Sequence, residues 1–258
     1  MYNVVSKAEK AHNDGVWCVT WSGNNRVITG SVDETVKGWN ISSENTNTLD
    51  KPLFSLGDHD LAIVSVTSSP DGSVFASSSM DGVIRVFDGS SASPKLLKSI
   101  QAGPTETWNI HLNPQSATTL ASGTHAGNIN IWDVKTGEKK TTYQTGAKFT
   151  MCVRYSPDGC LLASGGYDGA VCLFDAQNNN LIKKLPGHNK PVRTVAFSKN
   201  SEWLVTGSED QHINVYEVKS GEQIASLTGH KSWVLDTSTN PVVEYQFVSS
   251  SSDKKIKC

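Results

Sequence analysis

Histidine and aspartate, the residue types of this chain best suited to metal or acid–base chemistry, recur in register along it. An aspartate follows each of four histidines by 21 to 23 residues, the histidines being His12, His59, His188 and His230. In order along the chain, the aspartate position holds Asp33, Asp81, Ala126, Asp168, Asp210 and Asp253. A metal or acid–base site needs side chains that converge from different parts of the chain. Because these pairs are spread along the whole chain, one to a unit, we interpret them as structural.

Two other features could suggest chemistry. The glycine-rich segment 164–170, SGGYDGA, lacks the GK[ST] ending of a phosphate-binding loop and opens no helix, so we interpret it as a turn between strands. Cys152 and Cys172 lie in alternating apolar patterns, which favours burial in the core. No serine, cysteine or lysine stands in a nucleophile motif. The sequence therefore predicts no catalytic residue, no metal ion and no cofactor.

The aspartates mark an internal repeat. Each is followed by alternating apolar positions that end in an aromatic and a polar residue, in segments 31–40, 79–88, 124–133, 166–175, 208–217 and, without its aromatic, 251–258. The anchoring positions are 48, 45, 42, 42 and 43 residues apart. Since the histidine and aspartate motifs keep nearly the same spacing from one unit to the next, the repeat covers the whole chain.

Each unit has the sequence pattern of several short β-strands. In 151–185 the stretches MCVRY, LLASG, AVCLF and LIKKL are separated by turns of Gly, Pro, Asp and Asn. This pattern predicts a four-stranded antiparallel meander. In the first unit we expect strands near 16–21, 26–30 and 35–39. The chain is predicted to be all-β.

The amino-acid composition agrees with an all-β fold and argues against several classes of function. The chain has 258 residues, 37% apolar and only 19% charged, with many small polar residues that suit strands and turns better than long helices. A net charge of −2 gives no electrostatic footprint for nucleic acid. Five cysteines without regular spacing indicate free thiols in a reducing compartment. No apolar stretch is long enough to cross a bilayer, and the N-terminus lacks the apolar centre of a signal peptide.

The period, the four strands per unit and the Gly-His…Trp-Asp pattern resemble the WD-repeat β-propeller family over essentially the entire sequence. The resemblance implies seven blades in the family, and here five full blades plus a truncated sixth in one domain, 1–258. The repeats lie approximately at 12–57, 58–102, 103–145, 146–186, 187–228 and 229–258, the last incomplete. We expect the chain to be a fragment, because it stops within the sixth unit. Residues 3–10 would supply the outer strand of the last blade of a closed ring.

The resemblance also assigns the repeated polar residues to a buried hydrogen-bond network of histidine, serine or threonine, aspartate and tryptophan. Phe87 and Tyr216 take the place of the tryptophan in the second and fifth units. The network positions carried over are His12, Ser31, Asp33, Trp39, His59, Ser79, Asp81, Asp168, His188, Ser208, Asp210, His230, Ser251 and Asp253.

The irregular units carry a narrower resemblance. The third lacks both histidine and aspartate, the fourth has TGAKF where Gly-His is usual, and the sixth combines GHKSWVLD with FVSSSSDKKIK. This combination is similar to the WD-repeat subunits of the superkiller complex, which assists the exosome in 3′-to-5′ mRNA decay. In animals such subunits also serve the polymerase-associated factor complex in transcription elongation and histone modification. The resemblance implies a non-catalytic scaffold in cytoplasm and nucleus whose partners are the superkiller helicase and helical-repeat subunits, or polymerase-associated factor subunits, without direct binding of nucleic acid or membrane.

Two alternatives stay open. A WD-repeat adaptor of another assembly, such as a ubiquitin ligase or a chromatin reader, would differ only in its surface. A propeller with a ligand or an enzymatic site in its central channel would need convergent polar groups, for which the sequence shows no motif.

In a propeller, the residue before the repeated aspartate and the start of the innermost strand surround one mouth of the channel. The first set is Val32, Met80, His125, Tyr167, Glu209 and Ser252, and the second includes Trp17, Trp108, Arg193 and Trp233. Aromatic residues, Met and Arg are enriched at protein interfaces. We therefore predict a partner-binding surface formed by Trp17, Met80, Trp108, His125, Tyr167, Arg193, Glu209 and Trp233.

Overall fold

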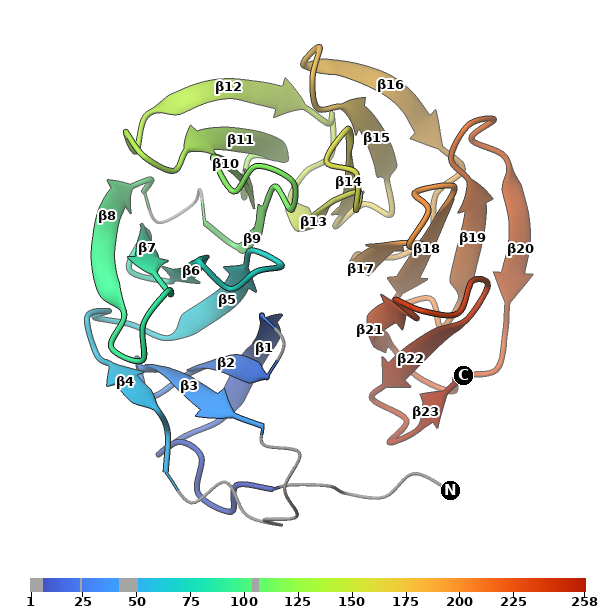
Figure 1. Cartoon of the computed structure of the whole chain (residues 1–258). Coiled ribbons are helices and arrows are strands. Elements are labelled where there is room, and N and C mark those ends of the chain that lie inside the picture. The colour runs from blue at the N-terminus through green and yellow to red at the C-terminus, as the bar shows by residue number, and fades with distance from the viewer. Residues whose placement is uncertain (1–6, 24, 42–50, 104–106) are drawn as a thin grey trace.

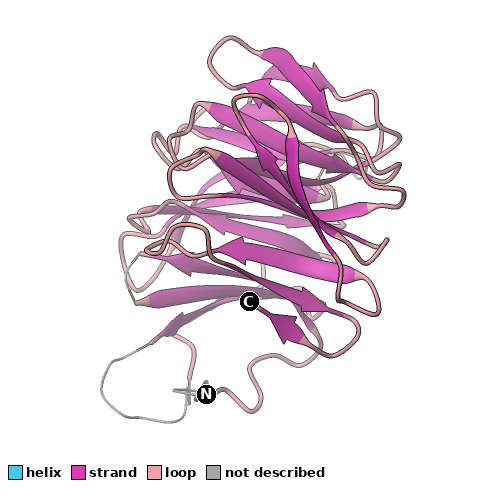
Figure 2. Ribbon diagram, turned by 90° about the vertical axis from the view of Figure 1, so that its right-hand side faces the viewer, coloured by secondary structure: helices cyan, strands magenta, loops and turns pink. Residues whose placement is uncertain are grey.

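The chain folds into antiparallel sheets arranged around a central axis. The computed structural model describes residues 7–23, 25–41, 51–103 and 107–258, and the elements in these ranges are all strands. They form six sheets, five with four strands and one with three. Figure 1 shows the sheets side by side in an arc, and Figure 2 shows the same arrangement from the side. The all-β propeller prediction is confirmed.

Five blades contain four strands each. The first blade has β1 (Val16–Ser22), β2 (Arg26–Ser31), β3 (Val36–Asn40) and β4 (Phe54–Leu56); the second has β5 (Ile63–Ser68), β6 (Val74–Ser79), β7 (Val83–Asp88) and β8 (Lys95–Gln101). The third has β9 (Asn109–Leu112), β10 (Thr119–Gly123), β11 (Asn128–Asp133) and β12 (Lys139–Gln144); the fourth has β13 (Thr150–Tyr155), β14 (Leu161–Gly166), β15 (Val171–Asp175) and β16 (Asn180–Leu185). The fifth has β17 (Val192–Phe197), β18 (Trp203–Ser208), β19 (Ile213–Glu217) and β20 (Gln223–Leu227).

The sixth unit corrects the predicted blade count. It forms a sheet of its own, in the order β21 (Val234–Thr239), β22 (Phe247–Ser251) and β23 (Ile256–Lys257). The described residues therefore make six blades rather than five and a remnant, because two long strands suffice to pack a sheet against the fifth blade. The seven-bladed ring stays a prediction, as does the single domain over 1–258. Residues 3–6 of the segment expected to supply an outer strand lie outside the described residues.

Turn chemistry fixes where the strands end. Between β13 and β14 the Ser156 hydroxyl binds the Asp158 carboxylate and the Gly159 amide donates to the Ser156 carbonyl at 2.8 Å. Gly159 has a φ of 70°, a conformation that costs glycine little. This tight turn brings Tyr155 opposite Leu162, so their alternation places the same faces in the core.

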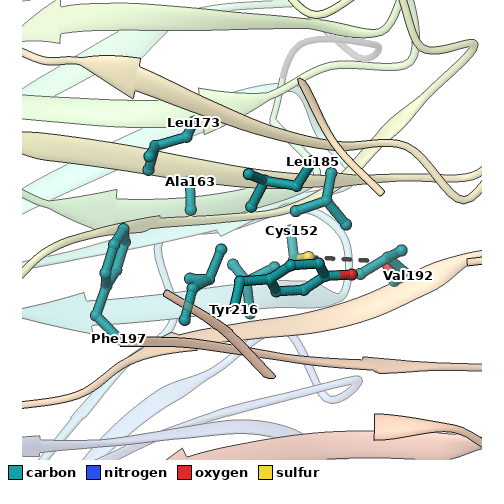
Figure 3. Packing of buried hydrophobic residues seen from close by; sticks show 10 residues of the cluster. Cys152, Ala163, Leu173, Leu185, Val192, Phe197 and Tyr216 are labelled. Atoms are coloured by element: carbon teal, nitrogen blue, oxygen red, sulfur yellow. Dashed lines mark hydrogen bonds between the residues drawn. The ribbon is translucent and has the colours of Figure 1, made fainter. Parts of the chain in front are cut away.

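Consecutive blades are joined by apolar clusters to which the third-strand aromatic of one blade contributes. Tyr216 of the fifth blade, fully buried, packs with Ala163, Leu173 and Leu185 of the fourth. Figure 3 shows this cluster, with the Cys152 thiol directed at the Val192 carbonyl at 3.6 Å. Cys152 and Cys172 are both buried, and burial raises the pKa of each thiol, to about 12 and about 11. The prediction that both cysteines are core residues is confirmed.

Between the fifth and sixth blades the packing is looser. Val205, Ile213 and Val215 meet Val234, and the described part of β23 contributes no aromatic residue. A largely apolar cavity of about 400 Å³ lies here, with Trp203 among the residues that line it.

Candidate partner-binding surface at the channel mouth

Four blades contain a buried histidine–aspartate pair. The distances from Nδ1 of the histidine to Oδ2 of the aspartate are 3.0 Å for His12–Asp33, 2.9 Å for His59–Asp81, 2.9 Å for His188–Asp210 and 3.0 Å for His230–Asp253. All four histidine side chains are almost inaccessible to solvent. Each pair belongs to its own blade, so the pairs do not converge on a shared site.

The hydroxyl partner of each histidine lies two residues before the predicted one. His12 Nε2 contacts the Thr29 hydroxyl at 2.8 Å, and Trp39 Nε1 donates to the same hydroxyl at 2.9 Å. The equivalent partners of His59, His188 and His230 are Ser77, Thr206 and Ser249. Ser31, Ser79, Ser208 and Ser251, which were placed in the same network, do not contact the histidines and join it through the aspartate amides.

Those four serines form the turn instead. Ser31 ends its strand, and its hydroxyl accepts the Asp33 amide at 3.1 Å and donates to the Asp14 carbonyl at 3.3 Å. The same two bonds recur at Ser79, Ser208 and Ser251. A hydroxyl that binds the amide two residues ahead favours a turn. These bonds tie the aspartate turn to the segment that precedes the inner strand.

Electrostatics fix the charge state of the pairs. Burial lowers the pKa of His12, His59 and His188 below the ordinary 6.5, against the opposing effect of the neighbouring aspartate. For Asp33, burial alone would raise the pKa, but hydrogen bonds from Thr35, the Asn13 amide and His12 hold it well below its ordinary value. These three imidazoles are therefore neutral at pH 7. His12 and His188 donate through Nδ1 to an ionised aspartate and accept at Nε2, whereas His59 Nδ1 contacts both Asp81 and the Arg85 guanidinium. With every position occupied, they have no free lone pair for a metal or a proton.

The third and fourth blades lack this pair. Asp168 accepts only the Ala170 amide, at 3.4 Å, and no histidine faces it among the described residues. Its predicted place in a histidine network is wrong, because the fourth unit has no Gly-His segment. In the third blade Trp132 Nε1 donates to the Ser122 hydroxyl at 2.9 Å without a histidine. No group of three or more His, Cys, Asp or Glu able to hold a metal occurs in the described ranges.

One backbone hydrogen bond, which recurs within five of the six described blades, builds the channel mouth. The residue before each repeated aspartate donates its amide to a carbonyl just ahead of the inner strand. The pairs are Val32–Gly15 at 3.0 Å, Met80–Ala62 at 3.1 Å, Tyr167–Phe149 at 2.8 Å, Glu209–Pro191 at 3.0 Å and Ser252–Trp233 at 3.0 Å. The two predicted sets of rim residues therefore lie at the same mouth.

β-Bulges direct two of these side chains. The β1–β2 register shifts between Val16 and Cys18, and the β17–β18 register between Val192 and Thr194. The extra residues are Trp17 and Arg193. A bulge re-aims its side chain relative to the regular alternation of the strand.

An aromatic group forms part of the mouth above the third and fourth blades. The rings of His125 and Phe149 stack with centroids 4.1 Å apart, and Trp108 meets both edge-on at 5.8 and 5.5 Å. Trp108 and His125 were predicted and Phe149 was not. Its position in TGAKF, directly before an inner strand, was the available signal.

A charged group lies above the fifth and sixth blades. Arg193 Nη2 pairs with Glu209 Oε1 at 2.6 Å, and the guanidinium lies over the Trp233 ring at 5.1 Å. Exposed fractions are 54% for Trp17, 40% for Met80, 55% for Tyr167 and 45% for Trp233. We call the eight predicted residues together with Phe149 the mouth surface. Large apolar side chains with this exposure, beside a satisfied ion pair, suit a protein contact better than catalysis.

The mouth surface opens onto a cavity in the channel. The cavity measures about 360 Å³ and is lined by residues of all six inner strands, β1, β5, β9, β13, β17 and β21. Its polar side chains include Asn109, Arg154 and Asp236. The sequence did not predict these three, because each stands alone among apolar strand residues and only the propeller geometry brings them together.

Comparisons with known proteins agree with this geometry. The family model of the IFT122 first beta-propeller matches residues 3–258. The chain belongs to this WD-repeat β-propeller family. It is 36% identical over 193 residues to WD repeat-containing protein SL1-17 of Schistosoma mansoni, covering 73% of this chain and 62% of that protein. It is 32% identical over 199 residues to WD repeat-containing protein VIP3 of Arabidopsis thaliana, covering 70% and 60%.

A third relative, the meiotic recombination protein rec14 of Schizosaccharomyces pombe, is 29% identical over 190 residues, covering 72% of this chain and 60% of that protein. The chain thus spans about three fifths of the length of these relatives. SL1-17 and VIP3 are named as WD repeat-containing proteins, and the family name is that of a β-propeller; none of these names indicates an enzyme. The described residues include no helix long and apolar enough to span a membrane.

Proposed function

We propose that the protein is a non-catalytic adaptor that binds protein partners through its mouth surface. The observation that carries this proposal is the collection of aromatic residues at one mouth. Trp17, Tyr167 and Trp233 are exposed and Trp108 is partly buried, although each could pack in a core. Aromatic residues in such a position supply much of the binding energy of protein interfaces. The buried histidine–aspartate pairs, already saturated with hydrogen bonds, hold the mouth turns in place.

The assembly proposed is the superkiller complex. Support comes from the resemblance of the irregular third, fourth and sixth units, and from the WD-repeat identity of the relatives. In this role the propeller would join the superkiller helicase and a helical-repeat subunit during exosome-mediated mRNA decay, in cytoplasm and nucleus. A second role in the polymerase-associated factor complex belongs to the same proposal. The relative named as a meiotic recombination protein indicates that propellers of this kind serve more than one process.

Affinity purification followed by mass spectrometry tests the proposal. The tagged wild-type protein should recover the helicase and helical-repeat subunits together, and Trp108→Ala should lose them. Leu97→Ala, which changes an exposed apolar residue on the outer strand β8, is the matched control. Recovery of a ubiquitin ligase or of chromatin proteins by the wild type, lost in Trp108→Ala, would keep the adaptor role and replace the superkiller assignment. Equal recovery by the wild type and Trp108→Ala would contradict the mouth surface itself.

A further inference from the structure

Arg154 places a guanidinium in the wall of the channel cavity. It lies on β13, between the buried residues Val153 and Tyr155, and its side chain is partly buried. Its Nη1 donates to Asn109 Oδ1 at 3.2 Å and to the Val153 carbonyl at 3.0 Å. Both acceptors are neutral. A guanidinium carries five N–H donors, and those on Nε and Nη2 contact no acceptor among the described residues.

The other three arginines have either their charge or their donors satisfied. Arg26 has no carboxylate partner, but all three of its nitrogens donate to the Ser22 hydroxyl or to the Gly72 and Gly89 carbonyls. Arg193 pairs with Glu209 at 2.6 Å and Arg85 with Asp81 at 3.0 Å. No carboxylate oxygen of the described residues lies within 4.0 Å of the Arg154 guanidinium, and the ion pairs of the described ranges do not include it. The nitrogens of Arg154 without a protein acceptor are not among the buried atoms that lack a partner, so they are open to the channel and accessible to an anion.

The carboxylate that lines the same cavity is engaged elsewhere. Asp236 Oδ1 accepts the Thr194 hydroxyl at 2.9 Å and the Thr237 amide at 2.9 Å. Asp236 belongs to β21 and Arg154 to β13, with β17 between them. Asp236 has no cationic partner among the described residues either, but its Oδ1 already accepts two hydrogen bonds, whereas two nitrogens of Arg154 keep donors that no described residue accepts.

We propose that Arg154 binds the carboxylate of an aspartate or glutamate side chain that a partner polypeptide inserts through the channel mouth. This inference rests on the adaptor function proposed above and names the chemistry that the partner must bring. The planar guanidinium matches a carboxylate with two parallel hydrogen bonds, and Asn109 holds it in place. Partial burial strengthens the pair relative to a solvent-exposed one.

The dimensions of the cavity favour a side chain as the occupant. Its volume of about 360 Å³ is near the lower end of the range for ligand sites. Val64, Val66 and Val195 line it beside the polar groups, which suits the methylene stem of an acidic residue. The aromatic residues of the mouth surface would bind the backbone and neighbours of the inserted residue.

Peptide selection provides the test. Peptides selected from a random library on the immobilised wild-type protein serve as the probes, and fluorescence anisotropy measures their affinities. We expect the selected peptides to share one acidic residue. Replacing it with Asn or Gln should weaken binding to the wild type at least tenfold, but binding to Arg154→Gln less than twofold. Lys199→Gln, which removes a positive charge in the β17–β18 turn, should bind like the wild type in both cases.

The outcomes separate this inference from the adaptor function. If Trp108→Ala weakens the peptides while the acidic-to-amide change has no effect on the wild type, the mouth surface stands and the Arg154 assignment fails. If neither change matters, both fail. Arg154→Lys keeps the positive charge but loses the two parallel hydrogen bonds of the guanidinium, so it should recover only part of the peptide affinity. If the Arg154 variants do not fold, the acidic-to-amide substitution in the peptide, measured on the wild type, tests the proposal by itself. Displacement of the peptide by inorganic phosphate, but not by sodium chloride of equal ionic strength, would show a phosphate site and overturn the proposal.

Discussion

At the scale of single residues, the histidine–aspartate pairs act on the stability of the blades. Asp210 accepts His188 Nδ1 at 2.9 Å, the Asn189 amide at 3.1 Å and the His212 amide at 3.0 Å. Removing the carboxylate would leave the buried His188 Nδ1 without a partner, which costs about 1–3 kcal/mol, and the more accessible Asn189 and His212 amides would each lose a charged acceptor. The pair therefore supports the mouth turn from within the blade.

We predict that Asp210→Ala lowers the free energy of unfolding by about 3 kcal/mol. The matched control is Asp168→Ala, which holds the same position in the fourth blade but accepts a single amide and should cost less than about 1 kcal/mol. Urea denaturation of both variants measures the difference. Equal losses would mean that the histidine contact contributes nothing.

The buried histidines also predict how stability depends on pH. Burial lowers the pKa of His12, His59 and His188 from 6.5, and burial together with the nearby Arg154 charge lowers that of His111 to about 3. Their pKa values are depressed in the folded state, so the unfolded chain binds more protons below pH 6.5. Their contribution is complete above this pH and is lost as the pH falls, by up to about 1.4 kcal/mol per histidine for each pH unit.

The urea midpoint should accordingly fall between pH 7.5 and pH 5.5, above the range in which the aspartates titrate. His188→Asn, which cannot gain a proton, should show a shallower loss. A midpoint that is constant or higher at pH 5.5 would contradict neutral buried histidines.

At the scale of strands and blades, much of the fold could be predicted because each unit repeats the same physical pattern. Strand positions in the first blade agree with the structure within two residues, since alternation and turn residues fix them locally. The sequence alone could not show which hydroxyl side chain contacts the histidine of each blade. Thr29 and Ser31 lie two residues apart on one strand and point to the same face, so only the sheet register shows which of them faces His12.

The contacts among the channel residues could not be predicted from the sequence of any single repeat unit. Arg154 and Asn109 come from different blades, and their contact depends on how the sheets are stacked around the axis. Phe149 illustrates the same limit, because its stacking on His125 joins two units. Local patterns therefore predicted elements and turns, whereas contacts between blades required the structure.

Close approach between blades requires a glycine at one position of the second strand. A Cβ atom on Gly165 would lie 2.5 Å from Val192 Cγ1 and 2.7 Å from Cys152 Sγ. Gly30 and Gly207 have the same surroundings in their blades, against Ile63 and Val234. Side chains this tightly packed cannot yield without shifting the next blade.

We predict that Gly165→Val lowers the free energy of unfolding by about 3 kcal/mol or more, because the added atoms overlap Val192 and Cys152. Gly57→Val is the control, since a Cβ there meets nothing within 4 Å. Thermal denaturation would show a large drop for the first and a small change for the second. A drop for neither variant would mean that the blades can separate at little cost.

At the scale of the whole molecule, the first blade presents an apolar face. Val19 and Trp21 are exposed, whereas Val195 and Phe197, which hold the same register in the fifth blade, are buried against the fourth. Figure 1 shows the first and sixth blades at the two ends of the arc. Exposed apolar faces of this kind promote association.

We therefore predict that Trp21→Gln reduces self-association of this chain at high concentration. Light scattering on matched samples measures the effect, with Leu97→Gln on the outer strand β8 as the control. Unchanged scattering with Trp21→Gln, or an equal decrease with Leu97→Gln, would show that this face does not drive association.

Binding at the mouth surface is the central claim at this scale. The aromatic group around Trp108 and the Arg193–Trp233 group lie above consecutive pairs of blades on one rim, so a partner that spans the mouth contacts both. Alanine at such a position typically costs more than about 1 kcal/mol of binding energy. The fold should tolerate these changes, because the side chains are partly exposed.

The most direct measurement is the affinity of purified variants for the partner recovered with the tagged wild-type protein. Trp108→Ala and Arg193→Glu should each bind at least fivefold more weakly than the wild type, about 1 kcal/mol, with melting temperatures that confirm folding. Leu97→Ala should bind normally. Normal binding by both mouth variants, together with loss of binding in Leu97→Ala, would place the partner on the side wall and contradict the account.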